Sequence, residues 1–304
     1  MDAHHLARNI KKAGGNLWQR LPTGLQERPP ARYVNNWIHR LARRFSSRKQ
    51  SHMAPTTTRF RRYPSLLLTI ADLIKNLPHG DTVRLCVMGC STGAELYSVL
   101  WAVRKARGDL KVQATGIDLS VSAVEKAKGG RYSTKDPELS GLPEEFWPEL
   151  FDLTQPDLTI KPSLRAGVEW IVGDVRDEGL RAQFGLQDIV IANNFLIFMK
   201  EREAESCLRN IVKLVKPRGL LLCRGVDLDV RERVAQQFHL RPISLRIEEL
   251  HEINVRERRG WPWEYWGLEP LDKTRRGWVR RYATIFQVPS SPEKIAVYES
   301  VLSS

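Results

Sequence analysis

The strongest constraint on the fold is a strand, a glycine turn and a helix that follow one another directly at Val83–Leu100. The apolar run VRLCVM leads into Gly89-Cys-Ser-Thr-Gly93, and a helical pattern begins at once. Leu96, Val99 and Val103 recur at helical spacing, so this helix can cover a sheet. Glycines here let the backbone approach a ligand at the carboxyl end of the strand, beside the positive helix N-terminus. The unit predicts a nucleotide-type pocket.

The rest of the chain from Thr82 onward alternates between short β-rich runs and longer helical runs. The expected strands are Thr82–Met88, Lys111–Ile117, Val168–Val172, Asp188–Ala192, Gly219–Cys223 and a final one at Arg281–Val288. The expected helices are Ala94–Arg107, Ser120–Lys128, Lys200–Leu214 and Asp229–Phe238. Such alternation is typical of βαβ units. It predicts an α/β fold with a Rossmann-like parallel sheet.

The chain divides into a basic N-terminal region, residues 1–55, and a main domain, residues 56–304. The first holds an expected helix at Tyr33–Phe45, so it is partly helical. The main domain carries a proline-rich insertion after its second strand, at residues 129–166, and long insertions of this kind tend to be functional. A segment rich in tryptophan and arginine, residues 256–282, is either core or a surface that grips peptide or nucleic acid.

Composition excludes several classes of protein. With 304 residues and 42% hydrophobic content, the chain can build a real core. The four cysteines form no CxxC pair and have no histidine-rich neighbourhood, so we expect reduced thiols and no metal site. No stretch approaches the roughly 20 apolar residues of a membrane helix, and the N-terminus lacks a signal-type apolar region. We therefore expect a cytoplasmic protein without a membrane span.

The net charge of +13 is concentrated at the N-terminus. Residues 1–62 contain 14 Lys or Arg against only Asp2 and Glu27. Such a basic arm can bind nucleic acid or an anionic lipid surface, with Trp18 and Trp37 adding stacking or insertion. The alternative is a solvated, partly helical extension, which is what charge runs usually mark.

The second expected strand ends in an acidic residue, Asp118. A carboxylate at this place can accept hydrogen bonds from both ribose hydroxyls of a nucleotide. The alternative role for Asp118 is an N-terminal cap of the following helix. The dinucleotide fingerprint G-x-G-x-x-G is absent, because Gly89 and Gly93 are separated by Cys-Ser-Thr, and this argues against NAD or FAD.

Other polar residues follow the expected strands. Glu95 fits a capping box with Thr92, and this role is compatible with ligand binding. Asp174 follows the third strand, where it either reaches an adenine amino group or is an ordinary surface-loop residue. Asn193-Asn194 follows the fourth strand, where ligands bind in open α/β sheets, although plain turn residues would look the same.

With these residues placed, Thr56–Gly225 resembles the chemotaxis-receptor glutamate methyltransferases, the CheR type. Five segments of the family pattern have counterparts here, in the same order. In the family they read N-x-T-x-F-F-R, A-G-C-S-T-G-E-E-P-Y-S, D-I-D, K-A-R-x-G-x-Y and D-L-I-F-C-R-N-V-L-I-Y-F. These counterparts are Thr56–Arg62 (TTTRFRR), Gly89–Ser98 (GCSTGAELYS), Gly116–Asp118 (GID), Lys126–Tyr132 (KAKGGRY) and Asp188–Phe198 (DIVIANNFLIF). The serine-threonine-glycine string is far more specific than a generic glycine loop.

The resemblance implies a class I methyltransferase sheet that binds S-adenosylmethionine (SAM) as its cofactor. The implied SAM contacts are Thr58, Gly89, Gly93, Glu95, Asp118, Asp174, Val175 and Asn194. The implied catalytic positions are Arg62, near the transferred methyl, with Asn194 and Phe198. In that family the acceptor is a glutamate side chain of a helical receptor protein, which is converted to its methyl ester, so a protein substrate is expected.

This chain departs from the family pattern at several positions. The aromatic after Phe60 is Arg61, the arginine before Asn194 is Asn193, and the active-site tyrosine is Phe198. Three functions follow: a methyltransferase for a protein carboxylate, one for RNA, DNA or a small molecule, and a SAM-binding regulator without turnover. The sequence does not indicate an oligomeric state.

Overall fold

The computed structural model describes residues 58–75, 77, 80–153, 157–257 and 269–290, together with isolated positions between 20 and 34. The described residues form a seven-stranded sheet in the order β6-β2-β1-β7-β8-β10-β9. Its strands are β1 (Thr82–Met88), β2 (Lys111–Asp118), β6 (Val168–Val172), β7 (Gln187–Asn193), β8 (Val215–Arg224), β9 (Arg241–Pro242) and β10 (Ile285–Gln287). Strands β6, β2, β1, β7 and β8 are parallel, and β10 runs antiparallel to both neighbours. The predicted α/β, Rossmann-like sheet is confirmed.

Helices flank the sheet on both faces. They are α4 (Pro64–Leu73), α5 (Ala94–Ala106), α6 (Val121–Gly129), α9 (Leu180–Phe184), α10 (Glu201–Lys213), α11 (Leu228–Gln237), α12 (Ile247–Glu257) and α13 (Trp278–Tyr282). Alternate residues of a strand point to opposite faces. Leu85 and Val87 of β1 accordingly lie in one apolar cluster with α4 and α5, whereas Cys86 and Met88 lie in a second cluster with α10 and α11.

Two of the helices that the sequence did not predict, α4 and α12, pack against each other. Helix α4 starts at Pro64, which suits the first helical position, and it buries Leu66, Leu67 and Ile70. Helix α12 packs against it: the Ser65 hydroxyl donates to Glu249, and Arg246 forms an ion pair with Asp72 at 2.6 Å. The C-terminal part of the chain is thereby joined to the segment that follows Arg62.

The final strand is shorter than expected. Arg281 and Tyr282, predicted as strand, instead end helix α13, and only Ile285–Gln287 pairs with β8. The reason is local: Gly277, with φ of 79°, starts a helical turn before the strand. Within this turn, Arg281 forms a buried ion pair with Glu269.

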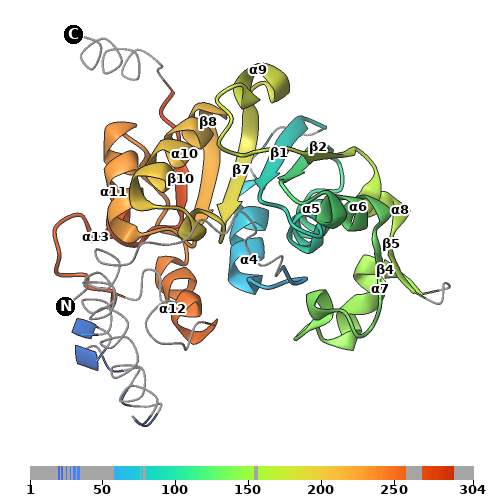
Figure 1. Ribbon diagram of the computed structural model, residues 1–304, viewed down its shortest axis with the longest axis horizontal. Coiled ribbons are helices and arrows are strands. Elements are labelled where there is room, and N and C mark those ends of the chain that lie inside the picture. Colours follow the sequence, from blue (N-terminus) through green and yellow to red (C-terminus); the bar gives the residue numbers. More distant parts are fainter. Residues whose placement is uncertain are drawn as a thin grey trace, which may run out of the picture.

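The insertion after β2 forms a small sheet of its own, with the order β3-β5-β4. Its elements are β3 (Arg131–Tyr132), η1 (Pro137–Leu139), η2 (Glu144–Phe146), α7 (Trp147–Leu150), β4 (Phe151–Asp152), β5 (Leu158–Ile160) and α8 (Pro162–Arg165). Phe60 packs edge-on against Tyr132 and Phe151, with ring centroids 4.9 and 5.1 Å apart. In Figure 1 this unit lies at one end of the molecule, beside α5 and α6, and α11 to α13 lie at the other end.

Several expectations lie outside the described residues. These are most of the basic N-terminal region, including all but the start of the Tyr33–Phe45 helix, and Trp261, Trp263 and Trp266. No helix in the described ranges is long and apolar enough to cross a membrane. The four cysteines are free thiols and all are buried.

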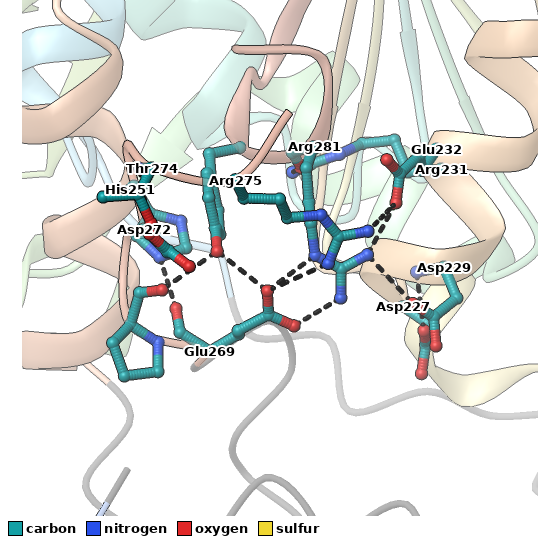
Figure 2. Close-up of polar contacts among 12 residues, drawn as sticks. Asp227, Asp229, Arg231, Glu232, His251, Glu269, Asp272, Thr274, Arg275 and Arg281 are labelled. Atoms are coloured by element: carbon teal, nitrogen blue, oxygen red, sulfur yellow. Dashed lines mark hydrogen bonds and ion pairs between the residues drawn. The ribbon is translucent and has the colours of Figure 1, made fainter. Parts of the chain in front are cut away.

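A buried charge cluster ties the last part of the described chain to α11 and α12 (Figure 2). Arg281, only 1% exposed, pairs with Glu269, with Asp229 at 2.9 Å and with Glu232 at 2.7 Å. The Tyr282 hydroxyl also donates to Glu269, at 2.8 Å. A guanidinium taken out of water is tolerated here because three carboxylates surround it.

Replacing Arg281 with alanine is expected to lower the free energy of unfolding by about 3–5 kcal/mol, because it removes the buried cation of three carboxylates and leaves Glu269 with the more distant Arg275, 3.6 Å away. Urea and thermal unfolding measure the loss. Arg280→Ala is the matched control, since Arg280 lies in the same short helix but is exposed. Its loss should stay within about 0.5 kcal/mol. Equal losses for the two variants would contradict a stabilising role of the cluster.

Candidate active site

The carboxyl ends of the parallel strands carry the glycine turn between β1 and α5. Gly89, Ser91 and Gly93 all have positive φ values, of 66°, 51° and 88°. A Cβ at Gly93 would lie 2.8 Å from the Trp170 ring and 2.9 Å from the Cβ of Ala127. The turn therefore needs glycine for its backbone conformation and for the packing behind it.

Asp118 lies directly against this turn. Its Oδ2 accepts a hydrogen bond from the Ser91 N–H at 2.7 Å, and its Oδ1 accepts one from the Ser120 N–H at 2.9 Å. Ser120 itself caps α6 by accepting from the Ala123 N–H, so the alternative of Asp118 as the helix cap is wrong. A carboxylate has about four acceptor positions. Asp118 therefore retains capacity for two hydroxyl donors.

Glu95, in the first turn of α5, points toward β7. Its Oε1 accepts from the Asn193 side-chain amide at 2.7 Å. The predicted capping box does not form, because the α5 cap is Gly93 without a side-chain bond, and Thr92 donates instead to Glu138 at 2.7 Å. Burial raises the pKa of Glu95, and this is opposed by the Asn193 hydrogen bond and by the charges of Arg62 and Arg224.

Asn193 and Asn194 diverge at the end of β7. Asn194 has φ of 63°, and its side-chain amide donates to the Tyr63 hydroxyl at 2.8 Å, whereas Asn193 binds Glu95. The next strand approaches so closely that a Cβ at Gly225 would lie 2.6 Å from the Asn194 Cα. These two amides are therefore fixed components of the carboxyl edge and not merely turn residues.

The two arginines before Tyr63 point to different places. The Arg61 guanidinium lies 3.2 Å from the centroid of the Phe146 ring and 4.7 Å from that of Trp101, so it occupies an aromatic slot by cation–π contact. Its backbone N–H donates to Ser98 at 2.9 Å. Arg62 lies 5.2 Å from the Tyr63 ring centroid and close enough to Glu95 to lower the pKa of that carboxyl. Arg62 thus lies near Glu95, and its place beside the transferred methyl stays a prediction.

Asp174 is held differently from the other acidic residues. Its Oδ1 accepts from the backbone N–H and the Nε of Arg176, both at 2.9 Å, and Arg176 also pairs with Glu203 at 2.8 Å. The Gly173 N–H donates to the Asp118 carbonyl, which keeps this loop beside the second strand. The contacts of Asp174 favour the loop-residue interpretation, and its adenine contact stays a prediction.

The remaining predicted site residues are placed as follows. Val175 is 5% exposed and packs in the cluster with α10. Thr58 is buried two residues before Phe60, whose backbone N–H donates to the Glu138 carbonyl. Phe198 ends the short helix η3 (Leu196–Phe198) after β7, and its side chain is 41% exposed.

Glu138 is a site neighbour that the sequence did not reveal. This insertion residue is 2% exposed, accepts from Thr92 in the glycine turn and pairs with Lys126 at 3.0 Å. Tyr132 reinforces the link by donating to the Thr92 carbonyl at 2.6 Å. No local pattern marks Glu138, because its partner lies 46 positions away. The insertion thus holds the turn from outside.

The side chains at this edge fit a cationic ligand that carries hydrogen-bond donors. The Ser91 hydroxyl and the Asn193 carbonyl oxygen are buried and have no hydrogen-bond partner among the described residues. Buried acceptors of this kind usually have a partner. Glu95 and Asp118 add carboxylates on either side of the turn, which suits the ammonium group and ribose diol of SAM. Within the described ranges, no three potential metal ligands gather.

Glu95→Gln is expected to stabilise the protein at neutral pH. The pKa of Glu95 is raised by burial, so the folded state favours the protonated form, and ionisation above the folded pKa costs stability. Glutamine removes that cost and can still accept from Asn193. The gain should be present at neutral pH and vanish below the ordinary pKa of 4.5. Thermal unfolding as a function of pH measures it, and a lower melting temperature of the variant at neutral pH would oppose the assignment.

A family model described as CheR methyltransferase, SAM binding domain, matches residues 56–239. The chain is 31% identical over 198 residues to the probable biofilm formation methyltransferase WspC of Pseudomonas putida, a match that covers 62% of this chain and 44% of that protein. The corresponding WspC protein of Pseudomonas aeruginosa is 27% identical over 198 residues, with 62% and 45% covered.

A third relative is the chemotaxis protein methyltransferase 2 of Vibrio cholerae, 21% identical over 177 residues, with 56% of this chain and 59% of that protein covered. The chain spans about half the length of the curated relatives it matches. The family model covers more than half of the chain, and its residues build the sheet edge described above. The chain therefore belongs to the CheR methyltransferase family, whose SAM-binding domain it carries at residues 56–239.

Proposed function

We propose that this protein transfers a methyl group from SAM to a carboxylate side chain of a protein, most simply a glutamate. The main support for the proposal is that Asp118, Glu95 and Arg62 lie around the glycine turn Gly89–Gly93. The family model that matches this chain describes a SAM-binding domain. The names of the relatives, which include a chemotaxis protein methyltransferase, support a protein as the acceptor.

In this proposal the cofactor lies along the carboxyl edge of the sheet. Asp118 accepts from the ribose hydroxyls, and Glu95, held by Asn193, accepts from the ammonium group. Gly89 and Gly93 let the backbone come close, and Thr58, Asp174, Val175 and Asn194 complete the set that the family resemblance implies. The buried acceptors on Ser91 and Asn193 gain donors when the ligand binds.

The acceptor carboxylate needs no chemical activation by the protein. Bound SAM supplies a methyl group activated by a sulfonium. A glutamate carboxylate, with an unperturbed pKa of about 4.3, is already ionised at neutral pH and needs no general base. What the protein must provide is alignment of the carboxylate oxygen with the methyl carbon and exclusion of water. Arg62 is suited to the first task because a guanidinium binds a carboxylate through two parallel hydrogen bonds.

A second hypothesis is a methyltransferase whose acceptor is a nucleic acid or a small molecule. It is motivated by Asn193 and Phe198, which replace the arginine and the tyrosine of the family pattern. The stability of the product distinguishes it, since methyl esters are released as methanol by base and N-methyl groups are not. A SAM-binding regulator, the third reading, would bind the cofactor without any transfer. We further propose that the protein acts in the cytoplasm, where SAM is available.

Asp118→Asn is expected to weaken SAM binding about 10- to 100-fold, because it removes a charged acceptor from the ribose hydroxyls, a loss of about 1.5–3 kcal/mol. Isothermal calorimetry with SAM measures it. Asp177→Asn is the matched control: it removes the same charge from an exposed loop position whose carboxylate, within the described part of the chain, accepts a local N–H bond from Gly179. Equal affinities of the two variants would rule out Asp118 as the ribose anchor.

Arg62→Ala is expected to lower methyl transfer about 100-fold or more while SAM affinity changes little, because the acceptor carboxylate loses a bidentate cation. Arg62→Lys should recover only part of the rate, since an ammonium lacks the planar fork. The assay incubates the protein with SAM carrying a tritiated methyl group and a lysate of its own cells, and scores volatile methanol after base. Label that resists base would identify a different acceptor chemistry.

A further inference from the structure

Tyr63 is the buried side chain on which several groups of the site converge. It is 4% exposed and lies between Arg62 and the first residue of α4. Its ring has the guanidinium of Arg224 at 3.6 Å from the centroid and that of Arg62 at 5.2 Å. The ring of this buried phenol is thus in contact with two cationic side chains.

The hydroxyl of Tyr63 is held in one orientation. It accepts a hydrogen bond from the side-chain amide of Asn194 at 2.8 Å. A phenol has one proton to donate as well as its acceptor positions. Since an amide N–H can only donate, the Tyr63 proton must be directed elsewhere. The Tyr63 hydroxyl is therefore available as a donor at the carboxyl edge of the sheet, on a ring whose centroid lies 5.2 Å from the Arg62 guanidinium.

Arg224 holds the ring in place. It is the last residue of β8, it is completely buried, and its Cα is the register partner of Asn193 in β7. Its carbonyl accepts from the Asn194 N–H at 2.9 Å, so the same residue fixes the backbone that carries the Tyr63 partner. The charge of Arg224 also reaches Glu95, whose pKa it lowers. Cation–π attraction of this kind is strongest when both groups are removed from water.

We propose that Tyr63 donates a hydrogen bond to the acceptor carboxylate beside Arg62, and that Arg224 is a positioning residue that fixes Tyr63 for this contact. The proposal rests on the proposed function, because it requires a carboxylate acceptor. In this arrangement Arg62 binds both oxygens of the carboxylate and Tyr63 donates to one of them, while a remaining lone pair of the other oxygen faces the methyl group.

The transfer needs no proton movement. The second carboxylate oxygen forms a bond to the methyl carbon while the carbon–sulfur bond breaks, and the electron pair of that bond stays on sulfur. The acceptor changes from a carboxylate to a neutral ester. A hydrogen bond from the Tyr63 hydroxyl serves here because it steers the carboxylate without transferring a proton to it.

The test compares Tyr63→Phe with wild type in the base-labile methyl-transfer assay, using the same cell fraction as acceptor. We expect kcat/KM to fall about 10- to 100-fold, the usual effect of a hydrogen bond to a charged group, while calorimetric SAM affinity stays within about twofold. Tyr97→Phe is the matched control, because it removes a buried hydroxyl that donates to the Ala127 carbonyl. Its kcat/KM should equal that of wild type.

Arg224→Gln is then measured alone and together with Tyr63→Phe. A positioning role predicts a lower kcat/KM for Arg224→Gln in the wild-type background and almost no further loss in the Tyr63→Phe background. Independent losses in the two backgrounds would mean that Arg224 acts only on the fold and would overturn its role. An unchanged kcat/KM for Tyr63→Phe would overturn the proposal for Tyr63.

Different assay results would contradict the role of Tyr63 and the proposed function. If wild-type protein forms base-labile methyl esters and Tyr63→Phe forms them equally fast, only the inference is wrong. If wild-type protein forms no base-labile product, the carboxylate acceptor itself is wrong, and the role of Tyr63 is overturned with it.

Discussion

The contact on which the site depends is the pair of backbone N–H bonds accepted by Asp118. One comes from Ser91 in the glycine turn and the other from Ser120 before α6, so a single carboxylate connects the ends of β1 and β2 with the starts of two helices. Both neighbouring loops are thereby fixed relative to each other. A ligand that binds at this edge finds its acceptors in place and loses little free energy in ordering them.

Around this centre, three separate parts of the chain contact the turn or the helix α5 that follows it. The insertion contributes Glu138, which binds Thr92, and β7 contributes Asn193, which binds Glu95. The segment before α4 is anchored through Arg61, whose guanidinium fills the slot between Trp101 and Phe146. The family pattern has an aromatic residue at position 61, and here the planar guanidinium of Arg61 lies against the rings of Trp101 and Phe146. Arginine in place of an aromatic residue therefore keeps the contact with these two rings and adds a positive charge.

The features that depend on local patterns could be predicted from the sequence. The buried run of β1, the two glycines of the turn and the acid at the end of β2 each carry a signal within a few residues, and all three lie where expected. Helix α4 was missed because a short helix with Leu66, Leu67 and Ile70 buried shows no clear polar face. Tyr63, Arg224 and Glu138 were missed for a different reason. Their partners are Asn194, Asn193 and Thr92, which are 131, 31 and 46 positions away in the sequence. Only the folded chain brings these residues together.

The position of β10 has a consequence for any attempt to isolate the cofactor-binding part. The family match ends at residue 239, yet β10 lies between β8 and β9 in the central sheet, with Ile285 opposite Leu222. A fragment cut at the family boundary would expose the edge of β8 and remove α12 from its place on α4. Open strand edges recruit other chains. The cooperative folding unit thus extends about fifty residues past the region that sequence similarity detects, at least to Gln287.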